Sequence, residues 1–174
     1  MRIEKLTTKF QEALGEAQSL ALGNDNQYIE PAHVLLAMLR QDDGPKALLQ
    51  RAGVNLLGLT QAGEAAMKKL PQVQGHEQVQ VGRDMVTLLQ ASEKEAMKRN
   101  DQFVASELFL LALADSKADI GNVVRANGLT RKSLETAIDA VRGGQSVDSA
   151  DAEDQRESLK KYCIDLTERA HQGK

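Results

Sequence analysis

The sequence predicts an all-α fold in which a four-helix unit is used twice, giving about eight helices in one domain with pseudo-twofold symmetry. The first observation is an ungapped repeat at a spacing of 75 residues, in which Leu35-Leu36-Ala37 returns as Leu110-Leu111-Ala112. Ten positions are identical between residues 6–66 and 81–141, where chance gives about four. The second observation is that nine further positions carry similar apolar or aromatic residues in both copies, such as Phe10 and Met85. The third is that no strand-length alternating run occurs, apart from a short stretch at Val79–Val81. A fixed period with matched apolar positions indicates one supersecondary unit used twice.

Start and stop residues at matching places define the helices of both copies. In the first copy, Thr8-Lys9-Phe10-Gln11 forms a capping box that starts a helix at Thr7 or Thr8, and Gly23–Asn26 stops it. Pro31 starts a second helix, and a short third helix over 46–52 is ended by Gly53. Asn55 caps a fourth helix that runs to about Lys69. The second copy predicts a helix over about 83–99, a next helix from Ser106, a third ended by Gly128 and a fourth capped by Thr130.

Composition excludes several classes of function. The net charge is −3, from 22 basic and 25 acidic residues, so neither nucleic acid nor a membrane surface is an expected partner. No stretch approaches the 18 apolar residues of a membrane span, and no secretory signal is visible. A single cysteine, Cys163, excludes an internal disulfide and is compatible with the reducing cytoplasm, where we expect the protein.

A search for catalytic and cofactor-binding patterns finds none. His33, His76 and His171 are scattered, without metal-ligand spacing, and are interpreted as surface or helix-cap groups. Gly173-Lys174 ends like a phosphate-binding loop, but Glu168 stands where that motif needs its first glycine. We therefore expect a binding module that is not an enzyme and that holds no metal and no cofactor.

The composition of the sequence changes after the second copy. Residues 1–142 form the predicted helical domain, and residues 143–158, rich in Gly, Ser and Asp, are predicted to be a flexible linker. Residues 159–174 regain helical spacing and are interpreted as the opening of a further domain. If the linker is flexible, deleting residues 143–174 should leave the thermal midpoint nearly unchanged.

Several segments together resemble one family. They are Leu6-Thr7-Thr8-Lys9-Phe10, Asn26–His33, Asp101–Phe109, Val141-Arg142-Gly143-Gly144, and a junction formed by Ala152–Gln155, Leu159–Tyr162 and Asp165–Ala170. They resemble the Clp amino-terminal domain, in the form found in ClpB-type disaggregases, and the junction resembles the entry to that family's first AAA+ ATPase module. The resemblance covers essentially the whole chain.

The resemblance implies a substrate-recognition domain that binds unfolded or aggregated polypeptide and passes it to an ATPase ring outside this chain. It also implies a bacterial parent protein that uses ATP and Mg, forms a homohexamer and cooperates with a DnaK-type chaperone system. The alternative is an adaptor-docking module, as in ClpA- and ClpC-type relatives. An exposed apolar patch rimmed by charge would favour the first reading, and a polar, well-defined site for a folded partner the second.

The resemblance also implies site residues. The family positions implicated in aggregate binding match Thr7, Asp101 and Glu107, and Leu108 is expected in or beside an apolar groove. A substrate-binding role requires these residues to be exposed on one surface. The competing interpretation is structural, with Thr7 as a helix cap and Glu107 as a favourable charge near a helix start. Ala91 and Glu95 occupy groove positions where relatives are expected to carry larger apolar residues.

Overall fold

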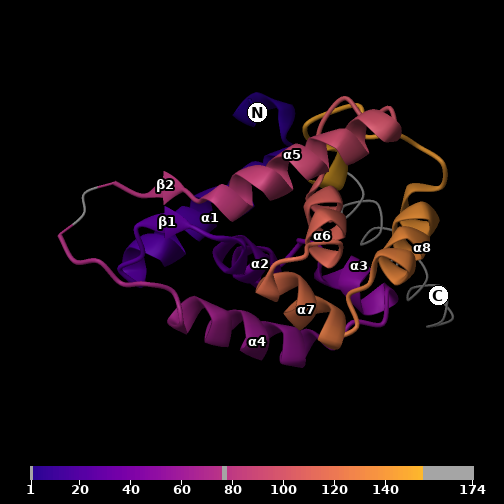
Figure 1. The fold of residues 1–174 in the computed structure, drawn as a ribbon. Coiled ribbons are helices and arrows are strands. Elements are labelled where there is room, and N and C mark those ends of the chain that lie inside the picture. The colour runs from indigo at the N-terminus through magenta and orange to yellow at the C-terminus, as the bar shows by residue number, and fades with distance from the viewer. Residues whose placement is uncertain (1, 76–77, 155–174) are drawn as a thin grey trace, which may run out of the picture.

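The structure, a computed structural model, describes residues 2–75 and 78–154, and the described chain is built almost entirely of helices (Figure 1). The helices are η1 Ile3–Lys5 (a 3-10 turn), α1 Thr8–Gly23, α2 Pro31–Arg40, α3 Lys46–Arg51, α4 Leu56–Lys68, α5 Arg83–Lys98, α6 Ser106–Ala114, α7 Asp119–Ala126 and α8 Arg131–Arg142. Two strands of two residues each, β1 Tyr28–Ile29 and β2 Gln80–Val81, complete the described elements. The predicted all-α fold is confirmed.

The two copies have matching helices. Helices α1 and α5 begin and end 75 residues apart, and the bounds of α2, α3 and α4 match those of α6, α7 and α8 at the same spacing to within two residues. The predicted caps are also present, since the Asn55 side chain accepts a hydrogen bond from the Gly58 N–H and the Thr130 hydroxyl accepts one from the Ser133 N–H. Within the short stretch at Val79–Val81, residues Gln80–Val81 form β2.

Backbone pairing crosses between the two copies. Strands β1 and β2 are parallel, with Ile29 opposite Val81. An isolated parallel bridge joins Leu6 to Val104, which is the same pair of positions with the two copies exchanged. The segment that enters the first helix of each copy is therefore held by the other copy, and for this reason the repeat forms one domain.

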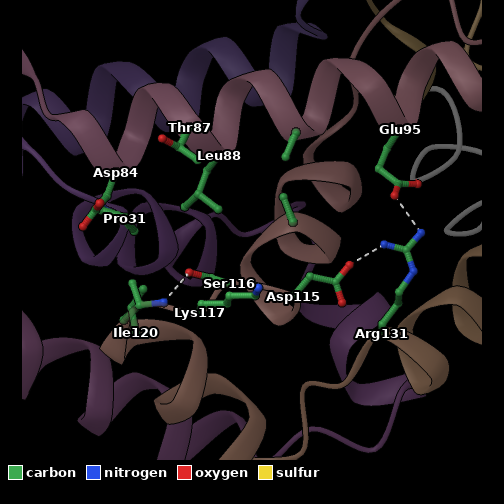
Figure 2. A pocket seen from close by; sticks show the side chains of 13 residues that line it. Pro31, Asp84, Thr87, Leu88, Glu95, Asp115, Ser116, Lys117, Ile120 and Arg131 are labelled. Carbon is green, nitrogen blue, oxygen red and sulfur yellow. Dashed lines mark hydrogen bonds and ion pairs between the residues drawn. The ribbon is translucent and has the colours of Figure 1, made fainter.

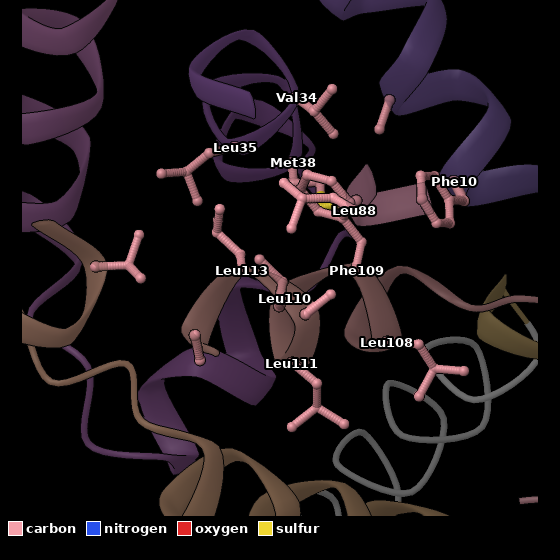
Figure 3. Close-up of a cluster of buried hydrophobic side chains, with 14 of the residues drawn as sticks. Phe10, Val34, Leu35, Met38, Leu88, Leu108, Phe109, Leu110, Leu111 and Leu113 are labelled. Atoms are coloured by element: carbon pink, nitrogen blue, oxygen red, sulfur yellow. The ribbon is translucent and has the colours of Figure 1, made fainter. Parts of the chain in front are cut away.

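The two central helices, α2 and α6, provide the core. In Figure 1 they lie between α5 along one edge and α4 along the other. Every residue of α6 is buried, as is every residue of α2 except Arg40, a pattern typical of a helix surrounded by protein. Phe10 of α1 meets Phe109 of α6 edge to face, with ring centroids 5.8 Å apart (Figure 3).

The predicted capping box of the first helix is wrong in its register. The cap of α1 is Thr7, whose hydroxyl accepts a hydrogen bond from the Phe10 N–H at 3.3 Å. The Gln11 side chain donates instead to the Leu6 carbonyl at 3.0 Å. Helix α1 therefore begins one residue before the place that the box requires.

The predicted flexible linker is wrong for residues 143–154, which pack against the domain. Val147 is buried, and its carbonyl accepts the Gln102 N–H at 2.9 Å. The Ala150 carbonyl accepts the Thr8 N–H at 2.8 Å, at the start of α1. Deleting residues 143–174 would remove these contacts, so the expected unchanged thermal midpoint loses its premise. Residues 155–158 of that linker, and the predicted domain opening at 159–174, lie outside the described residues.

We predict that Phe10→Ala lowers the free energy of unfolding by about 3–5 kcal/mol, because it leaves a cavity against Phe109 at the centre of the core. Leu57→Ala is the control, since Leu57 is 70% exposed, and it should change stability by no more than about 0.5 kcal/mol. Chemical denaturation followed by circular dichroism measures both. Equal effects of the two variants would contradict the central role of this contact.

Candidate functional site

A groove of about 390 Å³ opens between α5 and the segment that joins α6 to α7 (Figure 2). Its lining residues are Pro31, Asp84, Thr87, Leu88, Ala91, Glu95, Ala112, Asp115, Ser116, Lys117, Ala118, Ile120 and Arg131. They come from the start of α2, from α5, from the end of α6 and the loop after it, and from the starts of α7 and α8. The groove is therefore assembled from both copies, but mostly from the second.

Small and aliphatic side chains form the middle of the groove. Ala91 of α5 and Ala112 of α6 leave a hollow. Leu88 and Ile120 add larger apolar side chains to its lining, of which Leu88 is only 5% exposed and belongs to the core. The matching positions of the first copy differ, because Glu16 stands where α5 has Ala91. There the Gln41 side chain also bonds across to the Lys9 carbonyl at 2.9 Å. Ala112 has an identical counterpart in Ala37, so the hollow depends on Ala91, the residue that the two copies do not share.

One end of the groove is an ion-pair network centred on Arg131. Its guanidinium lies 2.6 Å from Glu95 and 2.5 Å from Asp115, and it also contacts Glu135. The hydrogen bond that Arg131 donates to Glu95, together with the neighbouring carboxylates, raises the pKa of Arg131. Three carboxylates face one guanidinium, so this end carries a net negative charge.

The other end of the groove is also acidic. Asp84 is exposed at the start of α5, beside Pro31 in Figure 2. Burial raises the pKa of the nearby Glu30, and repulsion from Asp84 raises it further. Lys117 lies along the rim between the two ends. The groove therefore offers apolar surface between two acidic ends.

The structure does not bring the four predicted site residues to this groove. Thr7, Glu107 and Leu108 are at most 1% exposed, and the Asp101 side chain is fully buried. The expectation that the polar three are exposed on one surface is wrong. Leu108 is part of the core instead of the groove, because α6 is covered on all sides. Ala91 and Glu95 do line the groove, as predicted.

Asp101 and Glu107 hold a buried arginine. The Arg142 guanidinium donates to both Asp101 oxygens at 3.0 and 2.8 Å, and to Glu107 Oε1 at 3.2 and 3.1 Å. An unpaired carboxylate buried at this place would be costly, so the pairing indicates a structural role for Asp101 and Glu107. Asp101 also accepts the Val147 N–H at 2.9 Å.

Glu153 is a residue that sequence reasoning missed. Its carboxylate accepts the Ser106 N–H and hydroxyl at 3.2 Å each, and it also accepts a hydrogen bond from the Thr7 hydroxyl. Ala105, the cap position of α6, has no side-chain oxygen. An alanine at a buried helix start implies a distant acceptor, but nothing in the sequence points to position 153.

In the first copy, the polar groups at the start of α2 find their partners within a few residues of sequence. The Glu30 N–H donates to His33 Nδ1 at 2.8 Å, so Nε2 carries the proton that reaches Asn26 Oδ1 at 2.8 Å. Burial lowers the pKa of His33 to about 4, and the ring is neutral at pH 7. His33 is thus a helix-cap histidine, one of the two roles expected. His171, Cys163 and His76 lie outside the described residues.

Two searches limit the chemistry of the described part of the chain. Among residues 2–75 and 78–154, no group of three His, Cys, Asp or Glu side chains could hold a metal ion. In the same ranges no helix has the length and apolarity needed to cross a bilayer.

The family follows from comparison with known proteins. Residues 5–127 match the family described as the Clp repeat (R) N-terminal domain, and this chain belongs to that family. The chain is 42% identical over its whole length to the chaperone protein ClpB of Vibrio cholerae and to that of Pseudomonas putida. It spans 20% and 21% of the length of these two relatives. It corresponds to their N-terminal region, a non-catalytic domain.

Solved structures share this fold. The Hsp104 N-terminal domain from Candida albicans matches with a TM-score of 0.74 at 22% identity, over 85% of this chain and 98% of that one. A ClpV N-domain, solved in complex with a VipB peptide, matches with a TM-score of 0.65 at 18% identity, over 84% and 92% of the two chains. At these identities the likeness concerns the fold alone.

We predict that Arg142→Ala lowers the free energy of unfolding by about 3–5 kcal/mol, because two buried carboxylates lose their common cation. Arg51→Ala, at an exposed position of α3, should stay within about 0.5 kcal/mol of the wild type. Urea titrations of the two variants provide the comparison. A stability loss below 1 kcal/mol for Arg142→Ala would show that Asp101 and Glu107 do not depend on it.

Proposed function

We propose that this domain recognises unfolded or aggregated polypeptide by binding short apolar segments in the groove between α5 and the α6–α7 segment. The observation that carries the proposal is the apolar middle of a 390 Å³ groove, open to solvent and bounded by charge at both ends. A bare apolar surface of this kind binds exposed hydrophobic side chains without demanding one sequence. Membership of the Clp family and likeness to ClpB chaperones support the proposal.

The parent protein would supply what this chain does not contain. We propose that it is a cytoplasmic, hexameric ATPase that uses ATP and Mg, works with a DnaK-type chaperone system, and receives the bound segment from this domain. The share of the ClpB relatives that this chain spans, about a fifth, supports a larger parent.

Thr7, Asp101, Glu107 and Leu108 take an indirect part in this proposal. Their burial favours the structural interpretation, in which they fix α1, α6 and α8. Any effect of changing them on polypeptide binding would then come through the shape of the domain. Leu88, Ala91 and Ile120 are the proposed contact residues.

Adaptor docking is the second candidate. The network of Arg131 with Glu95 and Asp115 gives the groove one rigid polar end, which suits a partner of defined structure. The ClpV N-domain solved with a VipB peptide is a fold relative that binds a specific peptide. The two candidate functions differ in one measurable property: binding of unfolded polypeptide tolerates changes in the ligand's sequence, whereas docking of a single adaptor does not.

We predict that Ala91→Trp weakens binding of a permanently unfolded protein, such as reduced and carboxyamidomethylated lactalbumin, by at least about tenfold in Kd. The indole would fill the hollow beside Ala112, while the partly exposed position tolerates it without unfolding. Ala65→Trp, at an exposed position of α4, is the matched control and should bind like the wild type. NMR titration of each variant gives the Kd. Equal affinity of both variants would exclude the groove as the binding site.

We predict that the acidic ends make the groove prefer basic neighbours. A peptide with an apolar core flanked by lysines should bind roughly two- to fivefold more tightly than the same core flanked by glutamates, since exposed charge pairs contribute about 0.5–1 kcal/mol. The ratio should fall as salt is added. Asp84→Asn should reduce it, whereas Asp42→Asn, on the exposed loop after α2, should not. A ratio that ignores both salt and Asp84 would overturn this preference.

A further inference from the structure

The segment that follows α8, residues 143–154, is bound to the domain at two helix starts. We name it the C-terminal strap. Near α1 it receives the Thr8 N–H at the Ala150 carbonyl and the Thr8 hydroxyl at Asp151, 3.0 Å away. Lys9 lies 3.5 Å from Asp154. At α6 the strap provides Glu153, whose carboxylate lies between Ser106 and Thr7.

The attachment is almost entirely polar. Val147 is the one apolar residue of the strap in the buried class, and Glu153 is its buried charge. Polar contacts of this kind exchange readily for water, whereas the apolar contacts of α2 and α6 do not. The strap therefore belongs to the part of the fold that opens first.

When the strap leaves, the Thr7 hydroxyl and the Ser106 N–H and hydroxyl lose Glu153 as acceptor, but the main supports of α1 and α6 remain. Thr7 continues to cap α1 through the Phe10 N–H, and Arg142 keeps both Asp101 and Glu107. The Ser106 N–H lies at a helix start, where water can replace a carboxylate. Release of the strap therefore exposes polar groups and leaves the core closed.

A hinge lies at the root of the strap. Gly143 and Gly144 have φ angles of 57° and 85°, in the left-handed region that glycine adopts without strain. They follow directly after Arg142, which the buried carboxylates fix in place. The chain can thus change direction immediately beyond a rigid point.

We propose that the C-terminal strap is a releasable tether, with Glu153 as the latch that holds it on the starts of α1 and α6. While docked, the strap leads the chain away from the domain at Asp154, beside the two helix starts. When released, it frees the ten residues 145–154 that follow Gly143–Gly144, which add up to roughly 35 Å of extended chain. The device would set how far this domain reaches from whatever follows it, independently of what its groove binds.

Amide hydrogen exchange on the 174-residue chain tests the proposal. The reporters are the Thr8 and Gln102 amides, which donate to the strap, and the Leu110 amide, which lies within the buried α6. In the wild type the two strap-bonded amides should exchange at least tenfold faster than the Leu110 amide. Glu153→Gln removes the latch charge at nearly constant size and should speed the two reporters by at least a further tenfold, with Leu110 unchanged.

Matched variants keep the test decisive. Asp148→Asn changes an exposed strap residue and should leave all three amides as in the wild type. Val147→Ala weakens the strap without touching its charge, and should act in the same direction as Glu153→Gln. If Glu153→Gln accelerates Leu110 as much as Thr8, the strap is an inseparable part of the core. If it leaves Thr8 and Gln102 unaltered, Glu153 is not the latch. Either result overturns the proposal.

Discussion

The burial of α6 on every side is the constraint from which most of the structure follows. A helix start carries unpaired N–H groups, and inside a protein these groups need acceptors. Helix α6 begins at Ser106 with no side-chain acceptor at Ala105, and in the docked state Glu153, from the far end of the domain, supplies that acceptor. The same burial encloses Glu107, which then requires Arg142, and Arg142 in turn requires Asp101. One enclosed helix thus dictates where α8 ends and where the strap lies.

The two copies meet the same constraint differently. In the first copy Pro31 has no N–H to satisfy, and Asn26 with His33 completes the start of α2 within a few residues of sequence. In the second copy an acid stands in the place of Asn26, and it binds a residue from α8 and the backbone of the strap. The first copy thus uses a neutral hydrogen bond between residues close in sequence, and the second copy uses an ion pair between residues far apart in sequence. This difference gives the domain one closed half and one half that depends on its C-terminal segment.

The groove shows the same divergence on the outside. Its hollow depends on alanines where α5 meets α6, and its acidic end depends on Arg131 of α8, matched in the first copy by Leu56. The ion pairs there are partly solvated and hold the groove's shape more than they stabilise the fold. The proposed recognition of apolar segments with basic neighbours therefore uses Ala91 and Arg131, which differ from their counterparts Glu16 and Leu56, together with Ala112, which matches Ala37. Thr7, Asp101 and Glu107, the polar residues expected to bind substrate, have side chains buried outside the groove and instead hold α6 and the strap in place.

The sequence by itself determined the all-α fold, the 75-residue repeat and the starts of seven of the eight described α-helices, all but α7. Those properties depend on local signals, such as Pro31, Asn55 and Thr130 at helix starts, which act within one or two turns. It also indicated Ala91 and Glu95 as groove residues. Only the tertiary structure decided that Asp101 and Glu107 are buried against Arg142, that Leu108 faces the core, and that residues 143–154 are docked. A Gly- and Ser-rich composition describes what a segment does when alone, and the partners of Val147 and Glu153 lie far away in sequence. Whether a charged side chain is exposed or buried depends on which distant elements cover it, and no local pattern contains that information.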